Sequence, residues 1–328
     1  MDQDSPKFMA CLREGSLTGL QTIPKSDLHN HAGRGGSLGY LSAWAQAEIA
    51  PPAAPFASLN SMQEWFEQNV KIHCPGISGY LKRIEAAFVQ AKQDSIARLA
   101  LSFGLGEIDS LGGMNPFMQA MDALHAAYAP GTAFLPELAL DRACDTEQTY
   151  GLAEEALSHQ WFVSIDICCN ELAQPIGPFQ KMYRLAKAMG VRRKAHAGEF
   201  GTAEDVRKAC ETLDLDEVHH GIAAAASAPV MRWLAENKIQ LNVCPTSNVM
   251  LGLVKGYAGH PIRILYDFGV PVTINTDDLL IFNQSVSQEY LNLFSAGSMP
   301  AEALDHIRLT GLGGFQDAKQ RPRPCYGQ

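Results

Sequence analysis

The sequence has no stretch of the roughly 20 apolar residues that a membrane-spanning helix requires. Its first 15 residues lack the basic flank and the apolar run of a secretory signal peptide, and its eight cysteines include no C-x-x-C pair. Clusters of basic residues are absent as well, and the formal net charge is -9. These absences predict a cytoplasmic protein with free thiols that binds neither membranes nor nucleic acid.

Short apolar, β-branched segments alternate with amphipathic segments over most of the chain. The predicted strands are Lys25–His29, Leu99–Leu105, Ala133–Leu140, Phe162–Ile167, Arg192–His196, Glu217–His220, Lys238–Cys244 and Pro271–Thr276. The predicted helices are Ser78–Ala100, Asn115–Ala129, Thr146–Gln160, Phe179–Gly190, Ala203–Leu213, Ala226–Asn237 and Ile262–Phe268. Eight such repeats predict an α/β fold, a (β/α)8 TIM barrel. A dinucleotide-binding sheet is disfavoured because no G-x-G-x-x-G follows the first strand.

The segment between the first two predicted strands is too long for one loop and one helix. Residues 40–78 contain a helical patch, the run Pro51-Pro52-Ala53-Ala54-Pro55 and a second helical patch. An insertion after a barrel strand lies over the carboxyl-terminal face, where active sites form. It is either a lid or pocket wall, or a packing segment without a role in gating. We expect residues 1–328 to form a single domain with a frayed tail at 320–328.

Histidines and carboxylates that suit a metal ion stand at the ends of three predicted strands. His29 and His31 are separated by one residue, so both imidazoles point to the same face of the first strand. His196 ends the fifth predicted strand and Asp277 follows the eighth. A catalytic zinc takes about three protein ligands and keeps one position open, and a fourth carboxylate is tolerated. The pattern predicts a metal centre at the barrel mouth.

Three further groups at strand ends suit acid–base chemistry: Glu199, His220 and Asp278. Gly198 allows a sharp turn, after which Glu199 faces the mouth. Because neighbouring strand residues point to opposite faces, only one of His219 and His220 is expected to face it. Each group also has a plain structural explanation, as a buried histidine or a helix cap, but their common placement favours metal-assisted hydrolysis.

With these residues in place, the chain resembles the adenosine deaminase family of the amidohydrolase superfamily. The resemblance rests on ordered blocks between about residues 25 and 290: Asp27-Leu28-His29-Asn30-His31, His196-Ala197-Gly198-Glu199, His220-Gly221, Cys244-Pro245-Thr246-Ser247-Asn248, and Asn275-Thr276-Asp277-Asp278 continuing to Leu280-Ile281-Phe282.

The resemblance implies a 6-aminopurine deaminase with one zinc ion per chain, or with iron or cobalt in its place. The implied metal ligands are His29, His31, His196 and Asp277. Glu199 then protonates the purine at N1. His220 orients the attacking water or takes its proton, and Asp278 hydrogen-bonds the attacking oxygen. The implied partner is a small purine nucleoside or derivative, and the oligomeric state is left open.

Two departures from the family pattern concern the substrate. The Gly-rich segment after His31 has no acid where the family usually has an aspartate that contacts ribose, and it contains Arg34. Arg34 either faces solvent or meets an anionic group of a modified nucleoside or nucleotide. Cys169 stands where the family has a glycine whose backbone contacts purine N3. We predict substrate contacts for Arg34, Cys169 and Gly198.

Other functions are less well supported by the sequence. Deamination of a different amino-heterocycle would use the same residues. A catalytically silent purine-binding protein would be expected to have lost Glu199 or Asp278, and both are present. An NAD- or phosphate-dependent barrel enzyme would need a Gly-rich phosphate loop before a helix, which the sequence does not place there.

Overall fold

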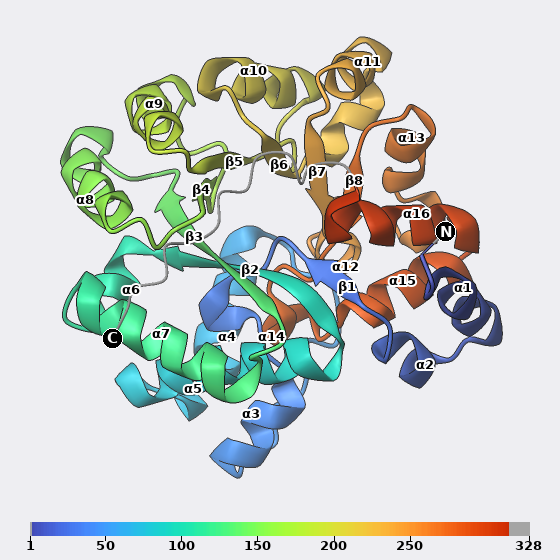
Figure 1. The fold of residues 1–328 in the computed structure, drawn as a ribbon, viewed down its shortest axis with the longest axis horizontal. Helices are drawn as coiled ribbons and strands as arrows, with labels where there is room; N and C mark the ends of the chain where they lie inside the picture. The colour runs from blue at the N-terminus through green and yellow to red at the C-terminus, as the bar shows by residue number, and fades with distance from the viewer. Residues whose placement is uncertain (1, 315–328) are drawn as a thin grey trace.

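A computed structural model describes residues 2–314, and the tail predicted to fray at 320–328 lies outside them. Eight parallel strands form one sheet in chain order, as the alternating pattern predicts. They are β1 (Lys25–Asp27), β2 (Ile96–Gly104), β3 (Ala133–Asp141), β4 (Ser164–Cys168), β5 (Arg192–Ala197), β6 (Glu217–His220), β7 (Gln240–Val243) and β8 (Val272–Ile274). Helices interleave with the strands and surround them, which confirms a TIM-like barrel (Figure 1).

The helices in the first half of the described chain are α1 (Ser5–Glu14), α2 (Leu17–Gln21), α3 (Leu38–Ala45), α4 (Leu59–Asn69), α5 (Gly76–Gln93), α6 (Leu105–Ser110), α7 (Met114–Tyr128) and α8 (Thr146–Ser158). Those in the second half are α9 (Gln180–Ala188), α10 (Ala203–Leu213), α11 (Ala228–Glu236), α12 (Pro245–Met250), α13 (Ile262–Asp267), α14 (Leu279–Phe282), α15 (Val286–Ser295) and α16 (Ala301–Leu309). Among residues 2–314, none of the helices is both long and apolar enough to cross a membrane.

Several strand and helix ends differ from the sequence-based prediction. The helix predicted to run to Ala100 ends at Gln93, and Ser95 adopts a left-handed φ of 51° immediately before β2. The first strand ends at Asp27, two residues earlier than predicted, and the eighth ends at Ile274. The chain leaves the ladder there because the residues that follow turn toward the barrel mouth.

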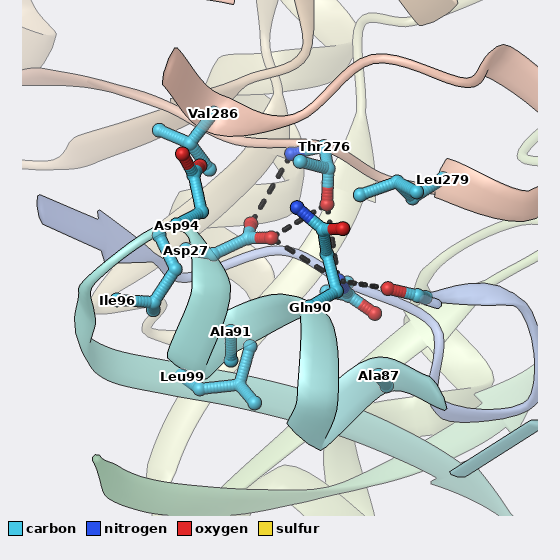
Figure 2. A pocket seen from close by; sticks show the side chains of 12 residues that line it. Asp27, Ala87, Gln90, Ala91, Asp94, Ile96, Leu99, Thr276, Leu279 and Val286 are labelled. Carbon is cyan, nitrogen blue, oxygen red and sulfur yellow. Dashed lines mark hydrogen bonds between the residues drawn. The ribbon is translucent and has the colours of Figure 1, made fainter. Parts of the chain in front are cut away.

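The first and last strands meet through only a few contacts. In the described chain, seven neighbouring strand pairs form ladders, whereas the ends of β1 and β8 are joined by the isolated bridge between Asn30 and Asp277. The Asp27 carboxylate adds to this closure by accepting hydrogen bonds from Thr276, at 3.1 Å from its amide nitrogen and 2.5 Å from Oγ1 (Figure 2). The barrel is therefore nearly closed, and a buried carboxylate reinforces the junction.

Beside this junction lies a small cavity of about 10 Å³, shown in Figure 2. Asp94 lines it and forms an ion pair with Lys25 at 3.8 Å. A volume of this size holds about one water molecule. The cavity is therefore too small for a substrate.

The segment after β1 forms its own apolar cluster, separate from the main core. Leu38 and Leu41 of α3 and Met62 and Phe66 of α4 pack with α14. The main core lies between the strands and the outer helices. This second cluster packs the segment after β1 against α14, which begins five residues after the end of β8.

Candidate active site

The carboxyl ends of β1, β5, β6 and β8 bring the predicted residues together. Nε2 of His29 and Nε2 of His31 each lie 3.3 Å from Oδ1 of Asp277. The ring of His196 lies 4.7 Å from that of His29, measured between centroids. All four side chains are buried or nearly so. Residues up to 248 positions apart in the sequence thus form one compact cluster.

Two positions in the cluster have an unusual backbone. Asp277 and His220 both adopt a φ of 61°, in the left-handed region that non-glycine residues rarely occupy. Such a conformation costs about 1–3 kcal/mol per residue and is typical of functional sites, where the surroundings enforce it. The turn at His220 ends β6, whereas the turn at Asp277 follows the end of β8 by three residues, and both residues line the pocket.

The donor atoms of this cluster fit a metal ion. Nε2 of His29 is buried and has no hydrogen-bond partner among the described residues. The Nδ1 atoms of the other two histidines are occupied, by Ser102 Oγ at 2.9 Å for His31 and by the Asp166 carboxylate at 3.0 Å for His196. Their Nε2 atoms are thereby left for an ion, and Asp277 adds a carboxylate oxygen. Imidazole and carboxylate ligands with fixed outer partners are typical of zinc and similar metals.

Glu199 reaches this cluster from a tight turn after β5. The Glu171 carboxylate accepts backbone N–H hydrogen bonds from Gly198 at 3.0 Å and from Glu199 at 2.8 Å, and two more from the next two residues. Gly198 has a φ of 70°, and an added Cβ would lie 2.2 Å from a methyl of Val206. Only glycine fits there. Burial raises the pKa of Glu199 well above its usual range, and the charge of Asp277 adds to this shift.

Of the two adjacent histidines, only His220 is among the described residues that line the pocket. Nε2 of His220 lies 3.6 Å from Glu199 and 3.8 Å from Asp277. Burial lowers the pKa of His220 to about 3, so its imidazole is neutral at physiological pH. His219 lies below the site, with its ring 3.8 Å from the ring of His29.

Arg34 does not face solvent, which corrects one of the two alternatives for it. Its Nη1 donates to Oδ2 of Asp278 at 3.1 Å, and its guanidinium lies 4.9 Å from the centre of the Phe66 ring. Its Nη2 also donates to Gln63. Arg34 therefore connects α4 with the carboxylate of Asp278. The solvent-facing alternative failed because the partner lies 244 residues away in the sequence.

A pocket of about 610 Å³ opens above the cluster. Its lining includes His196, Glu199 and Asp277, together with Arg34 and Cys169. Leu59, Met62, Gln63, Phe66 and Glu67 of α4 also line it. The size suits a small organic ligand. Gly198 is not among the described residues that line the pocket, so a substrate contact by Gly198 stays a prediction.

A model of the adenosine deaminase family matches residues 118–322 of the sequence. A Treponema pallidum protein, provisionally assigned as an adenosine/adenine deaminase, is 31% identical over 297 residues, which cover 89% of this chain and 99% of that protein. The chain belongs to the adenosine deaminase family.

Solved structures share the fold of this adenosine deaminase family member at lower sequence identity. An amidohydrolase from Burkhoderia ambifaria with bound Zn is 22% identical, with a TM-score of 0.78, over 92% of this chain and 89% of that one. An Arabidopsis protein named ADAL, complexed with IMP, is 18% identical, with a TM-score of 0.72, over 89% of this chain and 92% of that one.

Several residues of this family member's site were not predicted as functional. Asp166 fixes His196, and Glu171 holds the turn that carries Glu199. Glu137 binds the Nζ atom of Lys194 at 2.8 Å and Nε2 of His219 at 3.1 Å, inside the barrel. For Asp166 and Glu137, the signal in the sequence was a charged residue within a largely apolar strand, whereas Glu171 lies after the end of β4. A charge buried in a barrel core needs such a partner.

We predict that Asp166→Asn weakens metal binding by about 10- to 100-fold while the fold is kept. Asp166 holds Nδ1 of His196, so an amide in its place supports that ring less well. Competition with a chromophoric chelator would measure the affinity. Asp109→Asn, at an exposed position of the same pocket, is the matched control. Equal affinities in the two variants would remove Asp166 from the support of the site.

Proposed function

We propose that this family member is a zinc-dependent deaminase that hydrolyses the C6 amino group of a 6-aminopurine and releases ammonia. The observation that carries the proposal is a buried glutamate with a raised pKa beside a His/Asp cluster at the base of the pocket. The similarity to adenosine/adenine deaminases supports the choice of a purine.

The proposed ligands are His29, His31, His196 and Asp277. When bound, the ion supplies Lewis acidity and lowers the pKa of a water molecule toward about 7. Iron or cobalt suits the same donor atoms. The zinc carried by the Burkhoderia ambifaria amidohydrolase favours zinc.

The proton transfers are assigned to three side chains. Burial raises the pKa of Glu199, which favours its protonated form, and Glu199 donates a proton to N1 of the purine, which makes C6 electrophilic. Neutral His220 accepts a proton from the attacking water. Asp278 accepts a hydrogen bond from the same water, which fixes its direction of attack. Burial raises the pKa of Asp278, and the adjacent Arg34 opposes that shift.

We propose an uncharged substrate, either the free base or a nucleoside, ahead of a nucleotide. Three cationic side chains line the pocket, and each already has partners. Arg34 is paired with Asp278, Lys71 with Glu67 at 2.7 Å, and Arg83 donates to backbone carbonyls. A phosphate would therefore share each cation with a partner that is already in place. If a nucleotide is nevertheless bound, Arg34 is the residue expected to contact its phosphate, as the sequence also suggested.

Residues 40–78 are proposed to form a pocket wall that moves when substrate enters. Helix α4 provides one side of the pocket, and Arg34 links it to Asp278. The hydrogen bond between Arg34 and Gln63 of α4 would break and re-form during such a movement.

The proposal is tested by ammonia release from the zinc-loaded protein on adenine, adenosine, deoxyadenosine, AMP and 5′-modified adenosines. Turnover of the base or a nucleoside, with AMP at least about 10-fold slower in kcat/KM, is expected. Preferential turnover of AMP would contradict the uncharged substrate. With metal bound, no turnover of any purine would contradict purine deamination and would favour another amino-heterocycle or a silent binding protein.

A further inference from the structure

Two adjacent cysteines at the end of β4 point their thiols to the same side. Along an ordinary strand, neighbouring side chains point to opposite faces. Here Cys169 adopts a φ of 71°, which reverses the alternation, and the Sγ atoms of Cys168 and Cys169 lie only 3.6 Å apart. The backbone thus places two thiols in contact without a bond between them.

Both thiols belong to the wall of the substrate pocket. Cys169 is exposed, whereas Cys168 is buried, and both line the cavity of about 610 Å³ that also contains Glu199. A reagent small enough to enter the pocket therefore reaches Cys169 first. Other described cysteines, such as Cys11, Cys74 and Cys210, are buried away from this cavity.

We propose that Cys168 and Cys169 are a peroxide-reactive thiol pair that forms a reversible disulfide in the substrate pocket. The thiolate of Cys169 attacks one oxygen of hydrogen peroxide, the O–O bond breaks, and water leaves after protonation. The resulting sulfenic acid is attacked by the Cys168 sulfur, which forms the S–S bond, and a second water leaves with the Cys168 proton. Two thiols are oxidised and one peroxide is reduced to two waters.

Exposure sets the order of these steps, because Cys169 is exposed and Cys168 is buried. The contact between the two thiols also lowers the pKa of Cys169 and raises the pKa of Cys168. Cys169 is therefore the nucleophile toward peroxide and Cys168 is the resolving thiol.

The bond would disturb the turn that carries Glu199. Forming the bond strains the backbone at residues 168–169, because adjacent Cα atoms lie about 3.8 Å apart and disulfide-linked residues usually lie about 4.4–6.8 Å apart. Glu171 follows two residues later and holds four backbone amides of residues 198–201. A misplacement of about 1 Å costs about 100-fold in rate. The loss of activity rests on the proposed function, whereas bond formation does not.

The test starts with reduced, zinc-loaded protein exposed to hydrogen peroxide, and the unreduced peptides are mapped by mass spectrometry. The peptide that contains both cysteines should lose two hydrogen atoms and regain them with dithiothreitol. Cys144→Ala, at another thiol of the same pocket, should form the bond as the parent does. Cys168→Ala should instead accumulate a Cys169 sulfenic acid that dimedone traps.

Ammonia release measured on the same samples should fall by about 100-fold after oxidation and recover with dithiothreitol, while bound zinc stays constant. A peptide mass that peroxide leaves unchanged would overturn the proposal, and so would an unlinked sulfenic acid in the parent protein. A complete bond with unchanged turnover would overturn its effect on catalysis. Protein without turnover before oxidation contradicts the deaminase function alone, because the peptide mass still reports on the thiols.

Discussion

Glu199→Gln is expected to lower kcat for the purine substrate by about 10²- to 10⁴-fold, the contribution typical of a positioned general acid. Glutamine has nearly the same shape as glutamate but cannot donate a proton to a ring nitrogen as a carboxylic acid does. The turn itself should persist, because Glu171 binds backbone amides there and not the side chain of Glu199. Metal content and thermal unfolding should therefore match those of the parent.

The raised pKa of Glu199 gives this variant a second signature. Burial raises the pKa of this carboxyl group, so the parent rate should fall as the pH rises through that pKa. In the glutamine variant this alkaline limb should be absent from the residual rate. His220, with a pKa of about 3, is already neutral and contributes no limb near pH 7.

Glu67→Gln makes the same chemical change at the outer wall of the same pocket and serves as the control. Its side chain is half exposed and pairs with Lys71, so we expect a less than about 3-fold change in kcat/KM. Comparable turnover by the parent and Glu199→Gln would refute the assignment of Glu199 as the acid.

The second large effect is expected for His196→Ala. Loss of a residue that hydrogen-bonds a metal ligand, such as Asp166, weakens metal binding by roughly 10- to 100-fold, and loss of the ligand itself should weaken it more. The substitution removes one proposed ligand and also removes the hydrogen bond between His196 and the buried Asp166 carboxylate. The amount of metal per chain after dialysis would measure the loss of the ligand. The loss of the hydrogen bond to Asp166 would lower the melting temperature of the metal-free protein.

Added zinc separates these two effects. The parent should melt at a higher temperature with zinc than without it, because a ligand that binds only the folded state stabilises it. His196→Ala should show little of this shift. His125→Ala, at a half-buried histidine of α7 whose ring contacts Thr132, should retain the full shift. Parent-like metal content in His196→Ala would remove His196 from the ligand set.

The barrel was predictable because its signal is repeated and local. Each strand is a short apolar run that can be recognised without knowledge of its neighbours. The ends of the strands were less predictable. At β1 and β8 the chain leaves the ladder early, since Asp27 and Asp277 form contacts across the junction that only the folded chain provides.

The site was predictable where its residues occur as sequence motifs and unpredictable where they meet only in space. His29 and His31 form a pair within one strand end. Asp166 becomes recognisable as the support of His196 only when β4 and β5 are paired. Arg34 lies in a Gly-rich segment that indicates an exposed loop, yet a carboxylate from the other end of the chain buries it.

The sparse junction between the first and last strands gives a bound ion a structural consequence. Three of its four proposed ligands flank that junction, with two after β1 and one after β8. Elsewhere around the ring, neighbouring strands are held by a ladder of backbone hydrogen bonds, whereas here one bridge is supplemented by side-chain hydrogen bonds such as those of Asp27 and Asn275. A bound ion would therefore link the segments that follow β1 and β8. The same metal–ligand bonds would then support both the active site and the closure of the barrel.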